Sequence, residues 1–78
     1  MEIKILGSGC AKCKKLEEAA RVAVSELKIN AKVIKVEDMM EIMSYGIATT
    51  PAMVVDDKVL LKGRTASVEE IKTLLTNI

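Results

Sequence analysis

The most restrictive feature of this sequence is the junction of a strand pattern with a long helical pattern near its start. Residues Glu2–Leu6 alternate between charged and apolar side chains and are rich in isoleucine, which predicts a strand. After Gly7-Ser8-Gly9, apolar residues recur at helical spacing from Cys10 to about Lys28. A second strand pattern follows at Ala31–Val36, so the front of the chain predicts two parallel strands joined by a right-handed helical crossover.

Capping residues predict where the first helix ends and where the second one lies. Asn30 tolerates the left-handed backbone conformation and is predicted to close the first helix. Asp38 followed by Glu41 is a capping-box pattern, which predicts the start of a short second helix. Gly46 is predicted to end that helix.

The second half of the chain predicts a hairpin and a last helix. Ala52–Val55 and Lys58–Lys62 are strand patterns on either side of a tight turn at Asp56-Asp57. A second capping-box pattern, Ser67 with Glu70, opens the last helix. The complete order is β-α-β-α-β-β-α, which predicts an α/β fold with a four-stranded mixed sheet and three helices on both of its faces.

Length and charge narrow the class of protein. The 78 residues have room for one domain, which we expect to span 1–78. The formal net charge is +1 and both signs are mixed along the chain, which argues against nucleic-acid binding. The chain has no apolar run of membrane-spanning length, and its first residues do not resemble a signal peptide. We therefore expect a cytoplasmic monomer that works away from membranes.

The only two cysteines, Cys10 and Cys13, lie at the predicted start of the first helix. A helix N-terminus stabilises the thiolate, which is the reactive form of cysteine. Their spacing puts the two sulfurs one helical turn apart, where they can form a disulfide. Cys13 shares the apolar stripe of Leu16 and should face the core, whereas Cys10 should face solvent. We therefore expect Cys10 to attack a substrate disulfide and Cys13 to resolve the mixed disulfide.

Lysines surround this cysteine pair. Lys12 and Lys14 place positive charge near Cys10, which should lower the pKa of its thiol. Together with Lys15 they form a basic cluster that either attracts an acidic partner or is simply a solvated helix face.

Pro51, the only proline, directly precedes the strand pattern Ala52–Val55. The hypothesis is that the Thr50–Pro51 bond is cis and lies beside Cys10 and Cys13. In that arrangement the backbone of Thr50 would be held so that an extended substrate can pair with it. A trans bond in an ordinary loop is the alternative.

In these features the chain resembles the small prokaryotic glutaredoxin-like thioredoxins of the thioredoxin superfamily. The resemblance spans nearly the whole chain and rests on three segments: Gly7 to Cys13 with the helix that follows, Thr50-Pro51-Ala52, and Gly63-Arg64. It implies a thioredoxin-like fold and a reversible dithiol that reduces or exchanges disulfides in protein substrates. It also implies a thioredoxin-reductase-like electron donor, and it calls for no cofactor.

Several positions depart from the pattern of these families. Ala11-Lys12 stands between the cysteines where thioredoxins have Gly-Pro, and Lys4 stands where they have a buried acid. Gly63, Arg64 and Thr65 match only part of the segment with which glutaredoxins bind glutathione. Contact with glutathione or substrate through these three residues is therefore one hypothesis, and a plain loop before a helix is the other.

The alternative function is binding of a soft metal such as Cu(I) through the same two thiolates. Metal chaperones with a ferredoxin-like fold have a similar Gly-x-x-Cys-x-x-Cys loop, but that fold ends in a strand, and this chain is predicted to end in a helix. A zinc site usually needs four ligands, and the chain has two cysteines and no histidine. The methionines are interpreted as core packing, with a partner-binding surface left open for any that are exposed: Met39, Met40, Met43 and Met53.

Overall fold

The fold is seen in a computed structural model, which describes residues 1–7 and 11–77. Its elements, in chain order, are β1 (Glu2–Leu6), α1 (Ala11–Leu27), β2 (Lys32–Val36), α2 (Met39–Ser44), β3 (Ala52–Val55), β4 (Lys58–Lys62) and α3 (Val68–Thr76). The predicted order β-α-β-α-β-β-α is confirmed. The chain closes with a hairpin and then helix α3, which is the order that separates this fold from the ferredoxin-like one.

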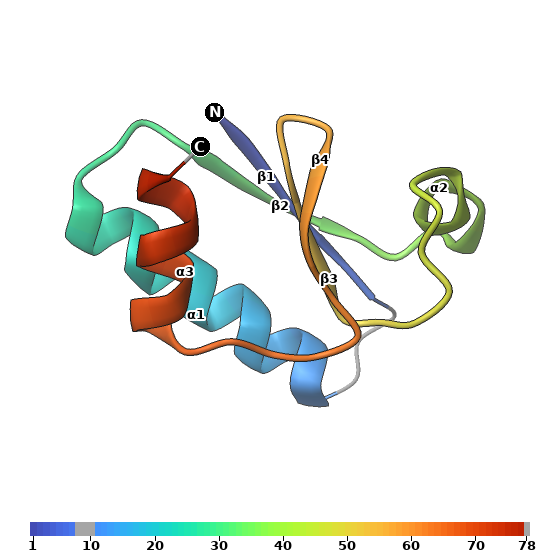
Figure 1. Ribbon diagram of the computed structural model, residues 1–78. Helices are drawn as coiled ribbons and strands as arrows, with labels where there is room; N and C mark the ends of the chain where they lie inside the picture. The colour runs from blue at the N-terminus through green and yellow to red at the C-terminus, as the bar shows by residue number, and fades with distance from the viewer. Residues whose placement is uncertain (8–10, 78) are drawn as a thin grey trace.

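The four strands form one mixed sheet in the order β2-β1-β3-β4 (Figure 1). β1 pairs in parallel with β2 and antiparallel with β3, and β3 pairs antiparallel with β4. Leu6, the last residue of β1, pairs with Val36 on one side and with Ala52 on the other. The end of β1 therefore lies beside the end of β2 and the beginning of β3, at one edge of the molecule.

Two apolar clusters hold the helices to opposite faces of the sheet. α1 and α3 pack side by side on one face, where Ile3 and Ile5 of β1 meet Leu16 and Ile71 (Figure 1). α2 lies on the other side, and its cluster consists of Leu6, Val36, Ile42, Ile47, Ala52 and Val54. Since neighbouring residues of a strand point to opposite faces, β1 contributes to both clusters.

The end of α1 differs from the prediction. The helix ends at Leu27, and the residue with left-handed backbone is Lys28, with φ of 54°, rather than Asn30. Leu27 and Ile29 both pack against the cluster under α1 and α3. The chain must turn between these two residues to bury both, so tertiary packing overrides the preference of asparagine.

The helix caps confirm only half of each predicted capping box. The side chain of Asp38 accepts a hydrogen bond from the Met40 N–H at 3.1 Å, and that of Ser67 accepts one from the Glu70 N–H at 3.2 Å. The carboxylate of Glu41 lies 3.6 Å from Lys4 Nζ, and that of Glu70 binds an arginine. A charged partner binds a carboxylate more strongly than a backbone N–H does, so the acidic residues turn away from the caps.

The two predicted chain reversals are confirmed. Gly46 follows α2 with φ of 74°, and its N–H donates to the Met43 carbonyl at 2.9 Å. Asp56 and Asp57 join β3 to β4 with φ of 47° and 70°. Positive φ at both central residues is typical of the turns that match the twist of a hairpin.

Within the described part of the chain, every helix is too short or too polar to cross a bilayer.

Candidate functional site

Cys13 is the member of the cysteine pair that the structure describes. Its side chain is 2% exposed and lies on the buried face of α1 with Leu16, Ala20 and Ala23. The predicted inward orientation of Cys13 is confirmed, because residues at this helical spacing share one face. Cys10, with the solvent-facing orientation predicted for it, lies outside the described residues.

The sulfur of Cys13 packs against the end of β1 at Gly7. A Cβ atom at this glycine would stand only 2.2 Å from Cys13 Sγ and 3.1 Å from Cys13 Cβ. Gly7 is buried, and its N–H donates to the Val36 carbonyl at 2.9 Å. The glycine therefore makes room for the sulfur. The sequence pattern places Gly7 in the break after a strand and in the segment that leads to Cys13, but it does not indicate this clearance, which arises only when α1 folds back over the sheet.

The segment before β3 lies next to the same point. The Thr50–Pro51 bond is cis, as predicted. Thr50 Cβ would lie 3.8 Å from a Cβ at Gly7, so the threonine and the Cys13 sulfur flank one position. Thr50 is exposed and Pro51 is buried. Among the described residues, the backbone N–H and carbonyl of Thr50 have no hydrogen-bond partner. The predicted nearness of this segment to Cys10 lies outside the described residues.

Gly63 borders the site on the side of β4. Its N–H donates to the Pro51 carbonyl at 2.9 Å. Its backbone has φ of 75°, and a Cβ here would meet Thr49 Oγ1 at 3.0 Å. A side chain at position 63 would therefore strain the backbone and push on the segment that leads to Thr50. Gly63 belongs to the site as a close backbone neighbour of that segment.

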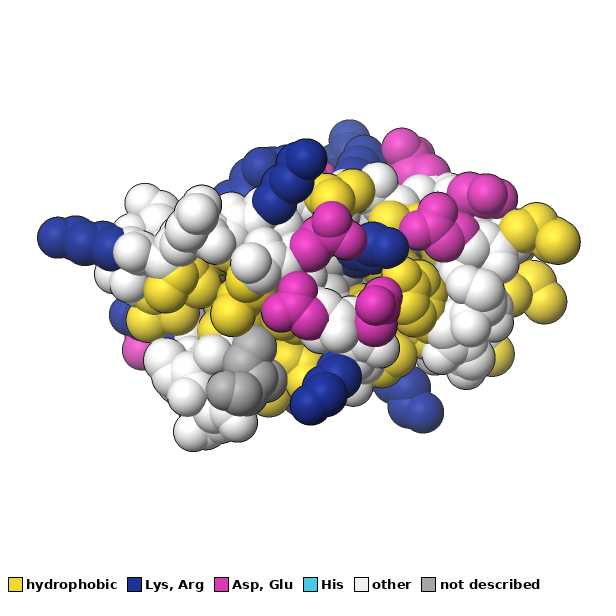
Figure 2. Space-filling view, turned by 90° about the horizontal axis from the view of Figure 1, so that it is seen from above, with side chains coloured by type: hydrophobic (Ala, Val, Ile, Leu, Met, Phe, Trp, Pro, Cys, Tyr) yellow, Lys and Arg dark blue, Asp and Glu magenta, His cyan; other side chains and the backbone are white. Residues whose placement is uncertain are grey.

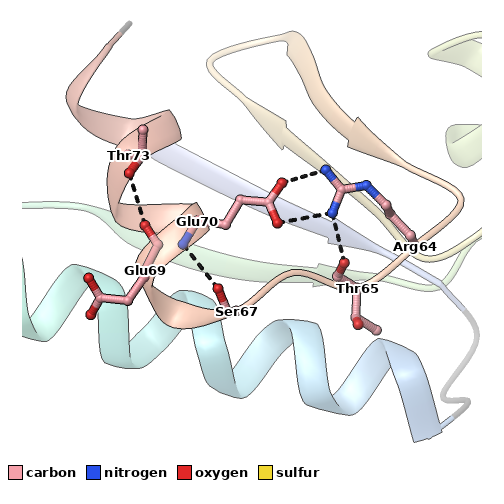
Figure 3. Close-up of polar contacts among 6 residues, drawn as sticks. All are labelled: Arg64, Thr65, Ser67, Glu69, Glu70 and Thr73. Carbon is pink, nitrogen blue, oxygen red and sulfur yellow. Dashed lines mark hydrogen bonds and ion pairs between the residues drawn. The ribbon is translucent and has the colours of Figure 1, made fainter.

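The side chain of Arg64 is turned toward α3, and Thr65 takes part in that contact through its backbone carbonyl. Arg64 Nη1 donates to Glu70 Oε1 at 3.0 Å and to the Thr65 carbonyl at 3.1 Å, while Nη2 binds Glu70 Oε2 (Figure 3). This pairing raises the pKa of Arg64 and lowers the pKa of Glu70, chiefly through the hydrogen bonds between the two side chains. The partner of Arg64 is Glu70, six residues later in α3, and the sequence pattern did not indicate this ion pair.

Comparison with known proteins agrees with this arrangement. The family model described as a thioredoxin domain matches residues 1–76. The chain belongs to the thioredoxin family. It is 45% identical over 76 residues to a thioredoxin of Methanothermobacter thermautotrophicus, a match that covers 97% of this chain and 99% of the relative. It is 43% identical over 70 residues to a thioredoxin of Methanocaldococcus jannaschii, covering 90% and 80%.

The family resemblance predicted from the sequence is therefore confirmed, and so is the thioredoxin-like fold. The relatives support a redox protein of the thioredoxin type, with disulfide oxidoreduction as its general activity.

Lys4 points to the face of the sheet that α2 covers. Its Nζ donates to Tyr45 Oη at 2.8 Å and lies 3.6 and 3.7 Å from the carboxylates of Glu41 and Glu2. The hydrogen bond with Tyr45 is the main cause that raises the pKa of Lys4. α1, which carries Cys13, covers the opposite face of the sheet. Lys4 thus fastens α2 to β1 in this member of the thioredoxin family.

The basic cluster predicted beside the cysteines is solvent-exposed. Lys12, Lys14 and Lys15 are exposed on α1, whose first turn has no acidic residue. Within the described residues, none of these lysines forms an ion pair. Positive charge at a helix N-terminus opposes the helix dipole, but it favours an anion bound there. Their effect on the Cys10 thiol lies outside the described residues.

Three methionines correct the interpretation of core packing. Met53 is fully buried, whereas Met39, Met40 and Met43 of α2 are 58%, 76% and 61% exposed. α2 is a short helix that buries only Ile42, so its other apolar side chains face outward. Figure 2 shows hydrophobic side chains projecting at the side of the molecule where Figure 1 places α2.

Two of these methionines, Met39 and Met43, line an apolar hollow of about 420 Å³ together with Gly46, Ile47 and Ala48. The last of these lining residues is followed directly by the segment that contains Thr50. In the parts of the chain that the structure describes, no group of three or more metal-ligating side chains comes together.

Proposed function

We propose that this protein is a thiol–disulfide oxidoreductase that uses Cys10 and Cys13 as a reversible dithiol for protein substrates. The observation that carries the proposal is the packing of the Cys13 sulfur against Gly7, beside the open backbone of Thr50. This arrangement places a buried sulfur beside Thr50, whose backbone groups make no hydrogen bond with any described residue. The membership of the thioredoxin family agrees with this use of the two cysteines.

The burial of Cys13 supports different roles for the two sulfurs. The Cys10 thiolate attacks one sulfur of the substrate disulfide, and the other substrate sulfur leaves as a thiolate. A protein disulfide cannot reach the sulfur of a residue that is only 2% exposed, so Cys13 acts within the molecule. The Cys13 thiolate attacks the Cys10 sulfur and releases the second substrate thiolate. The substrate gains two electrons, and the protein is left with a Cys10–Cys13 disulfide.

The segment at Thr50 supplies the means to hold an extended substrate. Its backbone N–H and carbonyl make no hydrogen bond with any described residue, and its side chain is exposed. An extended peptide can bind such groups by adding itself as a short strand. The hollow bordered by Met39 and Met43 then lies next along the chain and accepts an apolar side chain of the same substrate. Methionine suits this task because its unbranched side chain adapts to different shapes.

The cellular setting follows from the same proposal. The dithiol must be restored by a donor of two electrons, and a thioredoxin-reductase-like protein is the proposed donor. The reaction needs no cofactor, since electrons pass only between sulfur atoms. We propose that the protein works as a monomer in the cytoplasm, where a pair of cysteines usually serves redox chemistry or metal binding rather than structural cross-linking.

The test is a redox titration of the protein in defined thiol–disulfide buffers without metal, read by the mass shift on alkylation. We expect a reversible two-electron transition with a midpoint roughly between −300 and −180 mV. Cys10→Ser and Cys13→Ser variants serve as controls, because neither can form the intramolecular disulfide. If the wild-type protein forms no intramolecular disulfide at any potential of the buffers, the proposed function is wrong.

A further inference from the structure

The loop between β4 and α3 connects the candidate site to a closed ion pair. Its first residue, Gly63, donates its N–H to the Pro51 carbonyl at 2.9 Å, so the loop begins beside the proposed substrate segment. The next residue is Arg64, whose side chain reaches Glu70 in the first turn of α3 (Figure 3). An arginine therefore emerges at the border of the site while its charged group is held elsewhere.

The edge of the Arg64 guanidinium that carries its two terminal nitrogens, which is the edge that binds carboxylates, is already bound to Glu70. Both of its terminal nitrogens bind Glu70, one oxygen each, and Nη1 also donates to the Thr65 carbonyl. Glu70 is itself positioned, because its N–H donates to Ser67 Oγ at 3.2 Å. Paired donors on a planar guanidinium match the two oxygens of a carboxylate, which makes this the preferred geometry for binding an acidic ligand. Glu70 thus fills the place that the carboxylate of a ligand would take.

The pair is open to solvent, so a ligand can compete for it. The side chain of Arg64 is 56% exposed and that of Glu70 is 38% exposed. An ion pair at such exposure is weak enough for a ligand carboxylate to replace Glu70 on Arg64. Removing Glu70 should change the equilibrium constant for binding that carboxylate by about two- to fivefold. Competition for Arg64 is therefore a matter of specificity and leaves the reaction at the cysteines unchanged.

We propose that Glu70 acts as an internal competitor for Arg64 and thereby makes the protein discriminate against thiols that carry a carboxylate, glutathione included. This inference rests on the proposed function, since it concerns which thiols reduce the Cys10–Cys13 disulfide. Neutral thiols and polypeptide thiols without a neighbouring carboxylate are unaffected. Glu70 is a positioning residue, because it acts on an incoming thiol only through Arg64.

The reaction that shows this effect consumes two thiols for each disulfide. The thiolate of the first thiol attacks the Cys10 sulfur, and Cys13 leaves as a thiolate. The second thiol attacks the mixed disulfide at the sulfur of the first one, and Cys10 leaves as a thiolate. The two protons of the thiols pass to the two cysteines, and the oxidised product is the disulfide of the small thiol.

The test compares matched thiols and matched variants. The oxidised protein is mixed with 3-mercaptopropionate, glutathione or the neutral 2-mercaptoethanol, and its reduction is followed by alkylation and mass. We expect Glu70→Gln to be reduced about three- to fivefold faster than wild type by the two carboxylate thiols, and at an unchanged rate by 2-mercaptoethanol. The double variant Arg64→Gln with Glu70→Gln should return to the wild-type rates.

Glu69→Gln is the control for charge. Glu69 is the neighbouring acidic residue in the first turn of α3, but it lies 3.7 Å from Lys72 and does not bind Arg64. Equal acceleration in Glu69→Gln and Glu70→Gln would mean that only net charge matters, and would overturn the inference, as would no acceleration in either. If 2-mercaptoethanol also fails to reduce any disulfide in the wild-type protein, the proposed function is lost and the inference is lost with it.

Discussion

The sulfur of Cys13 packs so closely against Gly7 that any side chain at position 7 would force the sulfur or its helix to move. A Cβ there would come within 2.2 Å of Cys13 Sγ. Unlike the glycines at 46 and 63, Gly7 has no positive φ, so the requirement is steric and does not concern the backbone conformation. The end of β1 and the first turn of α1 are thus fitted to one another through a single sulfur atom.

We predict that Gly7→Ala destabilises the protein and disturbs Cys13. The new methyl group must displace the sulfur or the helix, and overpacking of this kind costs about 1–3 kcal/mol of unfolding free energy. Denaturant unfolding measures that loss, and the rate of alkylation of Cys13 in the reduced protein measures its exposure. We expect the alkylation rate to rise as the sulfur leaves its packed position.

The matched control for this variant is Gly46→Ala. Gly46 has φ of 74°, and no described residue lies within 4 Å of the added methyl group, so only the backbone is strained. A left-handed conformation costs a residue with a side chain about 1–2 kcal/mol. We expect a similar loss of stability here with no change in the alkylation of Cys13. Gly7→Ala with wild-type stability and wild-type alkylation would contradict the close packing.

The two cysteine variants should differ in what they trap. Cys13→Ser keeps the proposed attacking sulfur but loses the resolving one, so it should accumulate a mixed disulfide with a protein substrate. Cys10→Ser keeps only the sulfur of Cys13, a residue that is 2% exposed, and should accumulate none. Mass spectrometry of the acid-quenched mixtures gives the yield of adduct for each variant. A larger yield with Cys10→Ser would reverse the proposed roles.

The exposed methionines of α2 should matter only for large substrates. Replacing Met39 and Met43 together by glutamine removes apolar surface from the hollow, and we expect the efficiency with a protein disulfide to fall about three- to tenfold. Efficiency with a small disulfide should not change. Met40→Gln is the control, since Met40 is 76% exposed on the same helix but does not line the hollow. Equal losses in the two variants would show that the hollow is not the recognition site.

The Arg64–Glu70 pair predicts a change of stability with pH. The arginine lowers the pKa of Glu70 below its ordinary value of 4.5, so the folded state favours the charged carboxylate. The contribution of the pair is therefore present well above pH 4.5 and is lost as the pH falls through the lowered pKa. We expect wild type to have a higher melting temperature than Glu70→Gln at pH 7, and the difference to shrink in acid. A difference that is constant with pH would contradict the ion pair.

The sequence predicted what depends on local pattern. The strand at Glu2–Leu6 and the inward face of Cys13 follow from hydrophobic spacing, and the turn at Asp56-Asp57 follows from its residue types. The failures are at positions where distant parts of the chain compete. The left-handed residue after α1 is Lys28 and not Asn30, because of the packing of the neighbouring apolar residues. The carboxylate of Glu70 binds Arg64 on another segment instead of the backbone at its own helix cap.

Two features of the candidate site could not have come from the sequence. The clearance at Gly7 exists only because α1 returns over the end of β1, and no local pattern carries that information. The exposure of Met39 and Met43 was not predicted, because a chain without phenylalanine or tryptophan needs other large apolar residues in its core. Methionines were therefore expected to be buried. A short helix that buries one residue does not meet that expectation.

The hydrogen bond between Lys4 and Tyr45 has a spectroscopic consequence. Tyr45 is the only aromatic residue of the chain, and its hydroxyl group joins α2 to β1. All of the near-ultraviolet absorbance and intrinsic fluorescence from aromatic side chains therefore arises at one contact, on the face of the sheet away from Cys13. An optical signal from this protein reports the docking of α2, and the redox state of the sulfurs has to be followed by chemical labelling.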